Sequence, residues 1–422
     1  MAAEHFDALE TRSPEQREAS LLSALRTQIA HAQASAPALA QLLAGVDAAA
    51  IDSRQNLALV PVLRKQELLE RQKAHAKSDV FGGFSALGWG AARPAGQRAL
   101  RVFASPGPIH EPESARPDYW RMGRALFAAG FRAGDLVHNA FSYHFTPAGS
   151  MMESGAHAIG CTVFPAGTGQ SEQQVQAMAT LGPAAYAGTP SFLRILLDKA
   201  DEMGVALPSL TKAAVSAEAF PAALRDSLTA RGIRAYQSYG TADLGLIAYE
   251  TPAREGLVVD EGVVLEIVRP GTGEPVPSGE VGEVVVTTLN PDYPLIRFGT
   301  GDLSAVLPGP CPTGRTNTRI RGWLGRADQS TKVRGLFVHP SHVAEIARRH
   351  AEIGKARLVV EGEVAADRMT LRAEVAQAAE GLAERIAQTV RDVTKLRATV
   401  ELCPPGTLAN DGKVIEDLRP VG

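Results

Sequence analysis

Cysteine is scarce in this sequence, which contains three among 422 residues: Cys161, Cys311 and Cys403. Because the three lie far apart and are odd in number, we do not expect a disulfide framework. A reducing cytoplasm is the simplest compartment for such a chain.

Features that would indicate particular partners are also missing. The formal net charge of -3 gives no electrostatic reason to expect binding to nucleic acid or to an acidic membrane surface. No apolar run is long enough to span a bilayer, and Met1 to Asp7 lacks the basic and apolar regions of a secretory signal. Hydrophobic residues at 45% and charged residues at 21% are typical of a globular protein, and the length fits two or three domains.

An amphipathic helix is predicted near the N-terminus. Ser13 and Gln16 match a capping box, and Pro14 is a first-turn proline. An apolar stripe follows at four-residue spacing: Leu21, Leu25 and Ile29. The stretch from residue 35 to about 93 has an irregular pattern. We expect it to pack around a larger domain or to contribute to a dimer contact.

The middle of the chain predicts a largely parallel sheet. Five strands are expected: Leu136–Ala140, Cys161–Phe164, Ala184–Ala187, Ala213–Ser216 and Arg234–Gln237. Helical patterns lie between them, including Ser191–Met203 and Ala222–Arg231, so the strands are joined by crossover units. In such sheets ligands bind beyond the carboxyl ends of the strands. Ser216 to Glu218 and Tyr239 to Asp243 fall at two of these ends.

Two further regions complete the predicted organisation. Valine-rich runs at Val263–Val268 and Glu283–Thr288, separated by turns, indicate antiparallel sheet. After residue 325 the pattern predicts a small α+β domain. Its elements are strands Leu336–Val338, Ala356–Val360, Met369–Ala373 and Ala398–Leu402 and helices His342–His350 and Glu380–Val393. We therefore expect an α/β protein with a large domain over 1–325, including a β-rich subdomain at about 256–325, and a small mobile domain over 326–422.

Several polar residues have chemistry that suits a nucleotide. The ring of Tyr239 offers a flat face for a purine, and the carboxylate of Asp243 suits Mg²⁺ that carries phosphates. Asp302, in Thr300-Gly301-Asp302, could accept hydrogen bonds from both ribose hydroxyls. Plain turns with solvated aspartates explain both segments as well. Glu218 is alternatively a surface residue that caps the helix after Phe220.

Four motifs in a fixed order carry a family resemblance. They are Ser238 to Asp243, Arg297 to Asp302, Gly325 to Gly335, and the pair Gly412-Lys413. The set resembles the adenylate-forming, or AMP-binding, superfamily, and most closely its phenylacetate–CoA ligase branch. The resemblance implies ATP or AMP, Mg²⁺ and coenzyme A as co-substrates or cofactors, with the nucleotide in a cleft between the two domains.

The resemblance also implies roles for individual residues. Lys413, which is otherwise an ordinary lysine near the C-terminus, and Asp243 would be catalytic, the latter as the Mg²⁺ ligand. The nucleotide would contact Ser105, Gly107, Ser216, Ala217, Glu218, Tyr239, Gly240, Thr241, Asp302, Arg326 and Lys413. Asp328 would be the hinge, and Lys332, Arg334 and Gly335 the loop that serves coenzyme A. Phe141, Tyr143 and His144 would line a pocket for an aryl or arylacetic acid, unless these residues only belong to the core.

Three departures from the family pattern bear on activity. The place of the phosphate loop contains Pro106, Pro108 and Pro112, which remove amide donors, and Glu111 and Glu113, which repel phosphate. This predicts either a differently built phosphate grip or a loss of ATP turnover. Ala242 replaces the family hydroxyl, unless neighbouring Thr241 supplies one. The segment Cys311 to Asn317 keeps one ligand of a structural zinc that some relatives hold, so no zinc is expected.

The predicted function is an acid–CoA ligase of the AMP-forming type. A carboxylate would attack the α-phosphate of ATP with the help of Lys413, and the small domain would then rotate about Asp328 for attack by coenzyme A. Two rivals stay open: an acyl-AMP enzyme with another acceptor, such as an amine or a carrier protein, and a nucleotide- or acyl-binding protein without turnover. A homodimer is a further expectation.

Overall fold

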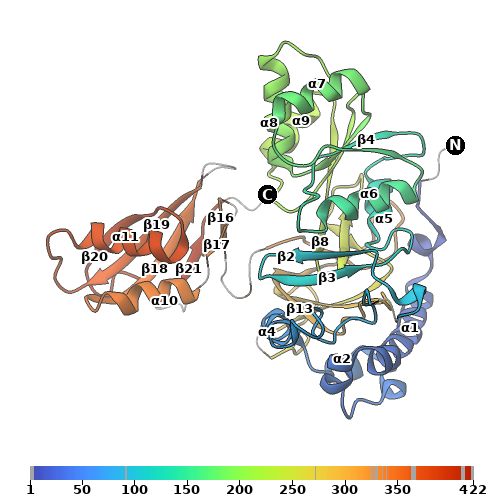
Figure 1. Cartoon of the computed structure of the whole chain (residues 1–422), viewed down its shortest axis with the longest axis horizontal. Coiled ribbons are helices and arrows are strands. Elements are labelled where there is room, and N and C mark those ends of the chain that lie inside the picture. The colour runs from blue at the N-terminus through green and yellow to red at the C-terminus, as the bar shows by residue number, and fades with distance from the viewer. Residues whose placement is uncertain are drawn as a thin grey trace. The chain divides into compact units, whose positions relative to one another are not determined.

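The computed structural model describes residues 4–90, 93–270, 272–324, 327, 331–334, 336–338, 340–362, 367–409 and 414–419. The chain divides into two compact units, Met1–Trp323 and Leu324–Gly422, and each is described by itself (Figure 1). Within the described residues, no helix combines the length and the apolar character that crossing a membrane requires.

The first unit begins with the predicted capped helix, α1 (Pro14–Ser35). The Ser13 side chain accepts a hydrogen bond from the amide of Gln16, and the Gln16 side chain accepts one from the amide of Ser13, which satisfies two amides at the start of the helix. Leu25 and Ile29 are fully buried. The burial of this stripe therefore fixes the face that α1 turns to the core.

The stretch after residue 35, whose sequence pattern is irregular, contains regular elements that were not predicted. It contains α2 (Pro37–Leu42), α3 (Arg54–Ala58), a short strand β1 (Leu63–Arg64) and α4 (Lys65–His75). In α4 only Leu68 and Gln72 are buried, so its apolar stripe is too thin to be recognised in the sequence. Leu68 joins the same hydrophobic cluster as Ile29 and Phe298, which makes this stretch part of the core of the first unit.

A nine-stranded sheet forms the centre of the first unit, in the order β14-β15-β10-β9-β8-β7-β6-β4-β5. Its parallel strands are β4 (Leu136–Asn139), β5 (Thr162–Pro165), β6 (Ala185–Gly188), β7 (Lys212–Val215) and the first part of β8 (Arg234–Thr241). The helices of this region are α5 (Met122–Ala128), α6 (Ala148–Ala158), α7 (Ser171–Leu181), α8 (Pro190–Glu202) and α9 (Ala222–Ala230). The predicted parallel sheet with crossover helices is thus confirmed.

Strand β8 is longer than predicted and has two kinds of neighbour. Up to Gln237 it pairs in parallel with β7, and from Ser238 it pairs antiparallel with β9 (Gly245–Glu250). The antiparallel part of the sheet continues with β10 (Leu257–Val259), β15 (Arg319–Ile320) and β14 (Val306–Leu307). Tyr239, Gly240 and Thr241 therefore lie within the strand and not in a loop after it.

Two smaller sheets lie beside this one. The first has four strands in the order β1-β13-β12-β11, with β11 (Val263–Val268), β12 (Gly282–Thr288) and β13 (Phe298–Ser304), as the valine-rich pattern predicts. The second is a hairpin of β2 (Arg101–Ser105) and β3 (Ile109–Glu113), which was not predicted (Figure 1).

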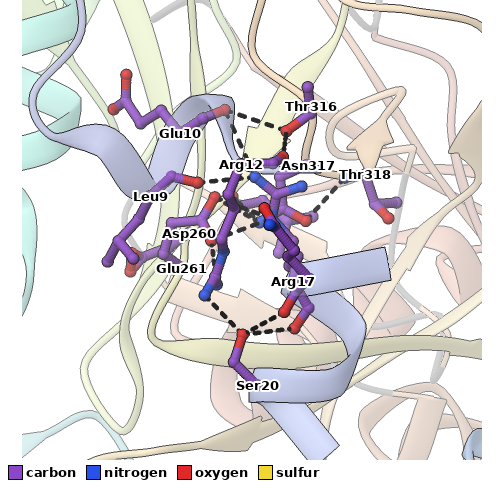
Figure 2. Close-up of polar contacts among 12 residues, drawn as sticks. Leu9, Glu10, Arg12, Arg17, Ser20, Asp260, Glu261, Thr316, Asn317 and Thr318 are labelled. Atoms are coloured by element: carbon purple, nitrogen blue, oxygen red, sulfur yellow. Dashed lines mark hydrogen bonds and ion pairs between the residues drawn. The ribbon is translucent and has the colours of Figure 1, made fainter. Parts of the chain in front are cut away.

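The N-terminal segment is joined to the loop after residue 311 by a network of charged and polar groups (Figure 2). The Nε of Arg17 lies 3.1 Å from Oε2 of Glu261, and both side chains are buried. The amide of Thr316 donates to the carbonyl of Glu10 at 3.0 Å, and the Asn317 side chain donates to the carbonyl of Val259 at 2.9 Å. These bonds attach the loop to the N-terminal segment and to β10.

At the centre of that attachment lies a buried carboxylate. Oε2 of Glu10 is 3.0 Å from Nε of Arg315, and Oε1 is 3.0 Å from Nη1 of Arg124 and 3.1 Å from the hydroxyl of Tyr249. In the described ranges, no three His, Cys, Asp or Glu side chains are grouped so that they could hold a metal ion. Cys311 is buried, with its sulfur 3.1 Å from the hydroxyl of Thr313.

The second unit is an α+β arrangement. Strands β16 (Thr331–Val333) and β17 (Leu336–Val338) pair with each other, and a sheet in the order β20-β19-β18-β21 follows. The elements of this sheet and its helices are α10 (Pro340–Arg349), β18 (Ile353–Glu361), β19 (Arg368–Val375), α11 (Leu382–Thr394), β20 (Thr399–Cys403) and β21 (Ile415–Asp417). Its core includes Ile346, Leu358, Leu371 and Ile386, all fully buried.

Candidate functional site

Two residues that the motifs single out 63 positions apart are in direct contact. The hydroxyl of Tyr239, on β8, donates to Oδ2 of Asp302, on β13, at 2.8 Å. Oδ1 of the same carboxylate accepts from the indole N–H of Trp323 at 3.1 Å. Asp302 is buried, and it already accepts two hydrogen bonds through its two oxygens. The two observed bonds show that the carboxylate can accept from one donor on each oxygen, so two hydroxyls, such as those of a ribose, could bind to it in the same way.

The backbone before Asp302 fixes the direction of its carboxylate. The hydroxyl of Thr300 donates to the carbonyl of Val284 at 2.9 Å and accepts from the amide of Asp302 at 3.1 Å. Gly301 between them has a φ of +72°, a conformation that costs little only for glycine. The Thr-Gly-Asp order thus has a local reason, which is independent of any ligand.

Asp243 follows β8 and lies beside a lysine that the sequence did not indicate. Oδ2 of Asp243 is 3.1 Å from Nζ of Lys65, the first residue of α4, and the Asp243 side chain is 1% exposed. Its Oδ1 is buried and has no hydrogen-bond partner. Buried polar atoms are normally paired, so this oxygen is suited to bind an added cation. A carboxylate that is fixed in this way fits Mg²⁺, which is commonly held by one or two carboxylates together with substrate phosphates.

The place expected for a phosphate loop is occupied by the turn of the β2–β3 hairpin. The hydroxyl of Ser105 donates to Glu111, and the Ser105 amide donates to Oε2 of Glu111 at 3.3 Å. Both donors of Ser105 are therefore used within the hairpin, whereas the sequence had suggested that they would meet phosphate. Gly107 lies in the turn between Pro106 and Pro108, neither of which has an amide proton.

Glu111 is completely buried in this hairpin. Burial, and next the negative charge of Asp243, raise the pKa of Glu111 to about 8. The hairpin is also fixed to α4, because the side chain of Gln72 accepts from the amide of His110 at 2.7 Å and donates to its carbonyl at 2.9 Å. One helix thus carries both Lys65 and the anchor of the hairpin.

The segment after β7 has a strained backbone and a capping side chain. Ala217 has a φ of +69°, which is unfavourable for a residue other than glycine. The hydroxyl of Ser216 donates to the carbonyl of Ser238 at 2.7 Å, which links β7 to β8. The exposed Glu218 accepts from the hydroxyl of Ser191 at 2.5 Å, in the first turn of α8. The alternative of capping the following helix was therefore wrong, since Glu218 contacts the preceding one.

The residues expected to line an acid pocket have three different surroundings. Phe141 is buried in the same core cluster as Trp120. The hydroxyl of Tyr143 donates to Oε2 of Glu153 at 2.8 Å, on α6, and His144 is exposed. A cavity of about 300 Å³ adjoins the Tyr143–Glu153 contact. Its lining includes Arg101, Glu113, Ser150, Glu153 and His157.

Other predicted site residues are less fully described. The hydroxyl of Thr241 accepts from the amide of Leu244 at 3.1 Å. In the second unit, Lys332 lies in β16, and Arg334 is exposed with its guanidinium 2.9 Å from the carbonyl of Asp367. The remaining predicted site residues lie outside the described ranges: Arg326, Asp328, Gly335 and Lys413.

Sequence reasoning missed two site residues, Lys65 and Trp323. Lys65 follows a two-residue strand and begins a helix with little apolar pattern, so no local signal sets it apart. Trp323 follows β15, and it contacts Asp302 because the chain after β15 lies beside the end of β13, where the hydroxyl of Ser304 donates to the carbonyl of Gly322 at 2.7 Å. Donors near the Asp302 carboxylate could be recognised only once the fold was known.

Comparison with known proteins supports a nucleotide site. Residues 118–290 match the family model described as AMP-binding enzyme. The chain is 29% identical to the phenylacetate-coenzyme A ligase of Thermus thermophilus over 94% of this chain and 95% of that protein. It is 31% identical to the phenylacetate-coenzyme A ligase of Aromatoleum evansii over 77% of this chain and 80% of that protein.

A solved structure covers nearly the whole chain. The crystal structure of 2-hydroxyisobutyryl-CoA ligase, in complex with 2-HIB-AMP and CoA in the thioesterification state, superposes with a TM-score of 0.76. Its sequence is 26% identical, and the match covers 99% of this chain and 93% of that chain. The mixed α/β architecture is thus shared with an adenylate-forming ligase.

Proposed function

Because the chain belongs to the phenylacetate–CoA ligase branch of the AMP-binding enzymes, we propose that it joins a carboxylic acid to coenzyme A through an acyl-AMP intermediate. In the first half-reaction the carboxylate attacks the α-phosphate of ATP, and pyrophosphate leaves. In the second, the thiol sulfur of coenzyme A attacks the acyl carbon, and AMP leaves with the acid oxygen that it had gained.

The observation that carries the proposal is the paired carboxylate of Asp302. Its two oxygens face two donors, Tyr239 and Trp323, at 2.8 and 3.1 Å. The hydroxyls of a ribose would replace or share these donors, and charge-assisted bonds of this kind are about twice as strong as neutral ones. Tyr239 would then present its ring near the base, while Ser216, Ala217 and Glu218 would border it, together with Gly240.

The phosphate side of the site would be held by Asp243 and by basic groups. Mg²⁺ bound there would supply positive charge that offsets the polyphosphate. Lys65 brings an ammonium group to the same place, where it now neutralises Asp243. Thr241 would contribute a hydroxyl near the α-phosphate in place of the one that Ala242 lacks.

The second unit would serve the two half-reactions in turn. Lys413 would offset negative charge while carboxylate and α-phosphate approach each other, together with Arg326 at the ribose. The loop of Lys332, Arg334 and Gly335 would serve coenzyme A, with Asp328 as the hinge between the two states. We further propose an aryl or arylacetic acid as substrate, on the basis of the aromatic Phe141 and Tyr143 and of the named relatives.

One observation favours a second candidate, a nucleotide-binding protein without turnover. In the β2–β3 hairpin the hydroxyl and amide of Ser105 are both bonded to Glu111, and two neighbouring prolines lack amide protons. Fewer backbone amides are therefore available to bind phosphate in this hairpin.

Acid-dependent exchange of labelled pyrophosphate into ATP separates the two candidates. We expect exchange with at least one member of a panel that includes phenylacetate, benzoate and 2-hydroxyisobutyrate, followed by thioester formation when coenzyme A is added. Measurable binding of ATP without exchange for any acid would instead favour the protein without turnover. Exchange without a thioester would point to an amine or a carrier protein as acceptor.

A further inference from the structure

We infer that Trp323 competes with ribose for Asp302: its indole N–H bonds to one carboxylate oxygen, and a ribose hydroxyl takes its place when a nucleotide binds. The contact itself is part of the structure, where Nε1 of Trp323 lies 3.1 Å from Oδ1 of Asp302. Naming ribose as the group that displaces the indole rests on the proposed function. Trp323 would then set the affinity for the nucleotide through a carboxylate that it shares with the ligand.

The two donors on Asp302 differ in the strength of their bonds. The hydroxyl of Tyr239 lies 2.8 Å from Oδ2, which is the usual length for a bond between a hydroxyl and an oxygen, about 2.7–2.8 Å. The indole bond to Oδ1, at 3.1 Å, is longer than the usual length for an N–H donor, about 2.9–3.0 Å. A hydroxyl donor therefore gains more by replacing the indole than by replacing Tyr239.

The two donors also differ in how firmly they are held. Tyr239 lies within β8 and packs against the core, and its hydroxyl is 3.3 Å from the hydroxyl of Thr300 as well as close to Asp302. Trp323 follows β15, which ends at Ile320, and its side chain is 37% exposed. Moving the indole costs little buried surface, whereas moving Tyr239 would disturb a strand. Trp323 is therefore the donor that leaves, and Tyr239 is the one that stays.

The backbone before Trp323 presents the indole to Asp302. The amide of Arg321 donates to the carbonyl of Ala305 at 2.9 Å, and the hydroxyl of Ser304 donates to the carbonyl of Gly322 at 2.7 Å. Gly322 has a φ of +94°, a conformation that costs little only for glycine. With the backbone fixed up to this point, the Trp323 side chain can leave Asp302 by changing its own rotamer.

This arrangement has opposite effects on the protein and on the ligand. Asp302 is buried, and a buried carboxylate oxygen without a donor costs free energy, so the indole stabilises the carboxylate before a nucleotide binds. A contact that occupies a binding group lowers the apparent affinity of a ligand, in proportion to the fraction of molecules in which the group is available. Removing the indole donor should therefore raise the affinity for AMP, although it removes a bond from the site.

Binding of AMP to the full chain, measured by calorimetry, tests the inference. We expect Trp323→Phe to raise the affinity roughly fivefold, whereas Tyr239→Phe, which removes the permanent support, should lower it. The analogue 2′,3′-dideoxy-AMP has no hydroxyl to offer Asp302, so it should bind equally well to wild type and to Trp323→Phe. Trp89→Phe is the matched control, because Trp89 is also exposed and lies outside the strands. It should leave the affinity for AMP unchanged.

A second measurement follows the indole in the wild type, so that it does not depend on the folding of a variant. The chain has three tryptophans, and the indole N–H signal of Trp323 in a nitrogen-15 spectrum is the one that Trp323→Phe lacks. AMP should shift this signal and speed its exchange with water, because the N–H loses its carboxylate partner. The dideoxy analogue should leave the exchange rate unchanged. Thermal unfolding reports whether each variant is folded.

Three outcomes would overturn the inference: weaker AMP binding by Trp323→Phe, equal gains for AMP and for the dideoxy analogue, or an indole signal that saturating AMP leaves in place. Pyrophosphate exchange is measured separately, to keep the inference apart from the proposed reaction. Exchange together with an unmoved indole signal refutes this inference alone. Displacement of the indole by AMP, without exchange for any acid, refutes only the proposed reaction.

Discussion

The hydroxyl of Tyr239 lies 2.8 Å from Oδ2 of Asp302 and so joins the nine-stranded sheet to the four-stranded sheet. The contact depends on the length of β8, which continues past its parallel partner and pairs with β9. That continuation carries Tyr239 to the strand that bears Asp302. A ligand that bonds to the Asp302 carboxylate therefore contacts a group held by both sheets, which keeps its position fixed before binding.

The Tyr239–Asp302 bond can be tested by removing one hydroxyl. Tyr239→Phe keeps the ring but deletes the donor, so the carboxylate loses part of its orientation. We expect AMP affinity to fall roughly fivefold, equivalent to about 1 kcal/mol, as measured by calorimetry. Tyr236→Phe, on the same strand, is the control and should leave the affinity unchanged. Unchanged binding by Tyr239→Phe would show that Asp302 needs no support from Tyr239.

If Lys413 acts only in the first half-reaction, its removal should affect the rates of the two half-reactions differently. Lys413→Ala should abolish acyl-AMP formation, because a positive charge is lost where two anions approach each other. Thioester formation from supplied acyl-AMP should persist. Both rates are measured on the same preparation, with Lys199→Ala as control, since Lys199 is a partly exposed lysine that pairs with Glu202 on α8. Equal loss of both half-reactions would contradict a role restricted to the first.

Glu10 is expected to be important for the stability of the first unit. Glu10→Gln removes the charge that Arg315 and Arg124 share. It leaves the buried guanidinium of Arg315 poorly compensated, whereas Arg124 keeps its ion pair with Asp7. We expect the free energy of unfolding in urea to fall by about 3 kcal/mol. Glu18→Gln on α1 is the matched control, since its partner Arg54 is partly exposed and such pairs contribute less than about 1 kcal/mol. A similar loss in both variants would contradict the argument.

The same network bears on the predicted lack of zinc. The loop from Cys311 to Asn317 is bonded to Glu10 of the N-terminal segment by Arg315 and Thr316, and to the carbonyl of Val259 by Asn317. A zinc-selective chelator should therefore leave the melting temperature unchanged, and elemental analysis of the purified protein should find far less than one zinc per chain. A chelator-dependent fall in melting temperature together with stoichiometric zinc would refute the prediction.

The sequence predicted the parallel strands to within two residues, except for the end of β8, because alternating strands and helices are a local pattern. It could not reveal that β8 continues to Thr241, since this extension depends on pairing with β9. Nor could it reveal the Lys65–Asp243 contact, which joins residues 178 positions apart. Asp302 and Tyr239 were singled out by their motifs, but their hydrogen bond follows only from the meeting of two sheets.

The β2–β3 hairpin escaped prediction for a different reason. The family resemblance placed a phosphate loop in the segment from Phe103 to Glu113, yet Pro112 lies within β3, opposite Val102. A two-stranded ribbon tolerates proline where its missing amide is not needed for pairing. The burial of Glu111 depends on the neighbouring elements, and charge alone would have predicted a solvated side chain.

Asp118 is expected to make stability depend on pH. Burial raises the pKa of Asp118 from 3.8 to about 7, although the amide of Gly123 donates to it at 3.0 Å. Between about pH 4 and 7 the folded protein retains a proton that the unfolded chain has released. The free energy of unfolding therefore falls as pH rises through this window and levels off above it. A pKa shift of this size corresponds to roughly 4 kcal/mol in the free energy of unfolding. The actual contribution is smaller, because Asp118 is only partly buried and solvent screens its charge.

Asp118→Asn removes the titrating group and still offers an oxygen to Gly123. We expect wild type to lose about 1–2 kcal/mol more stability than this variant between pH 5 and pH 7.5, measured by urea unfolding at each pH. The exposed Asp226→Asn is the control and should follow the wild type. Because every other titrating group is common to the two proteins, only the difference between their pH profiles reports on Asp118. Parallel profiles for wild type and Asp118→Asn would show that this carboxyl group does not hold its proton in the folded state.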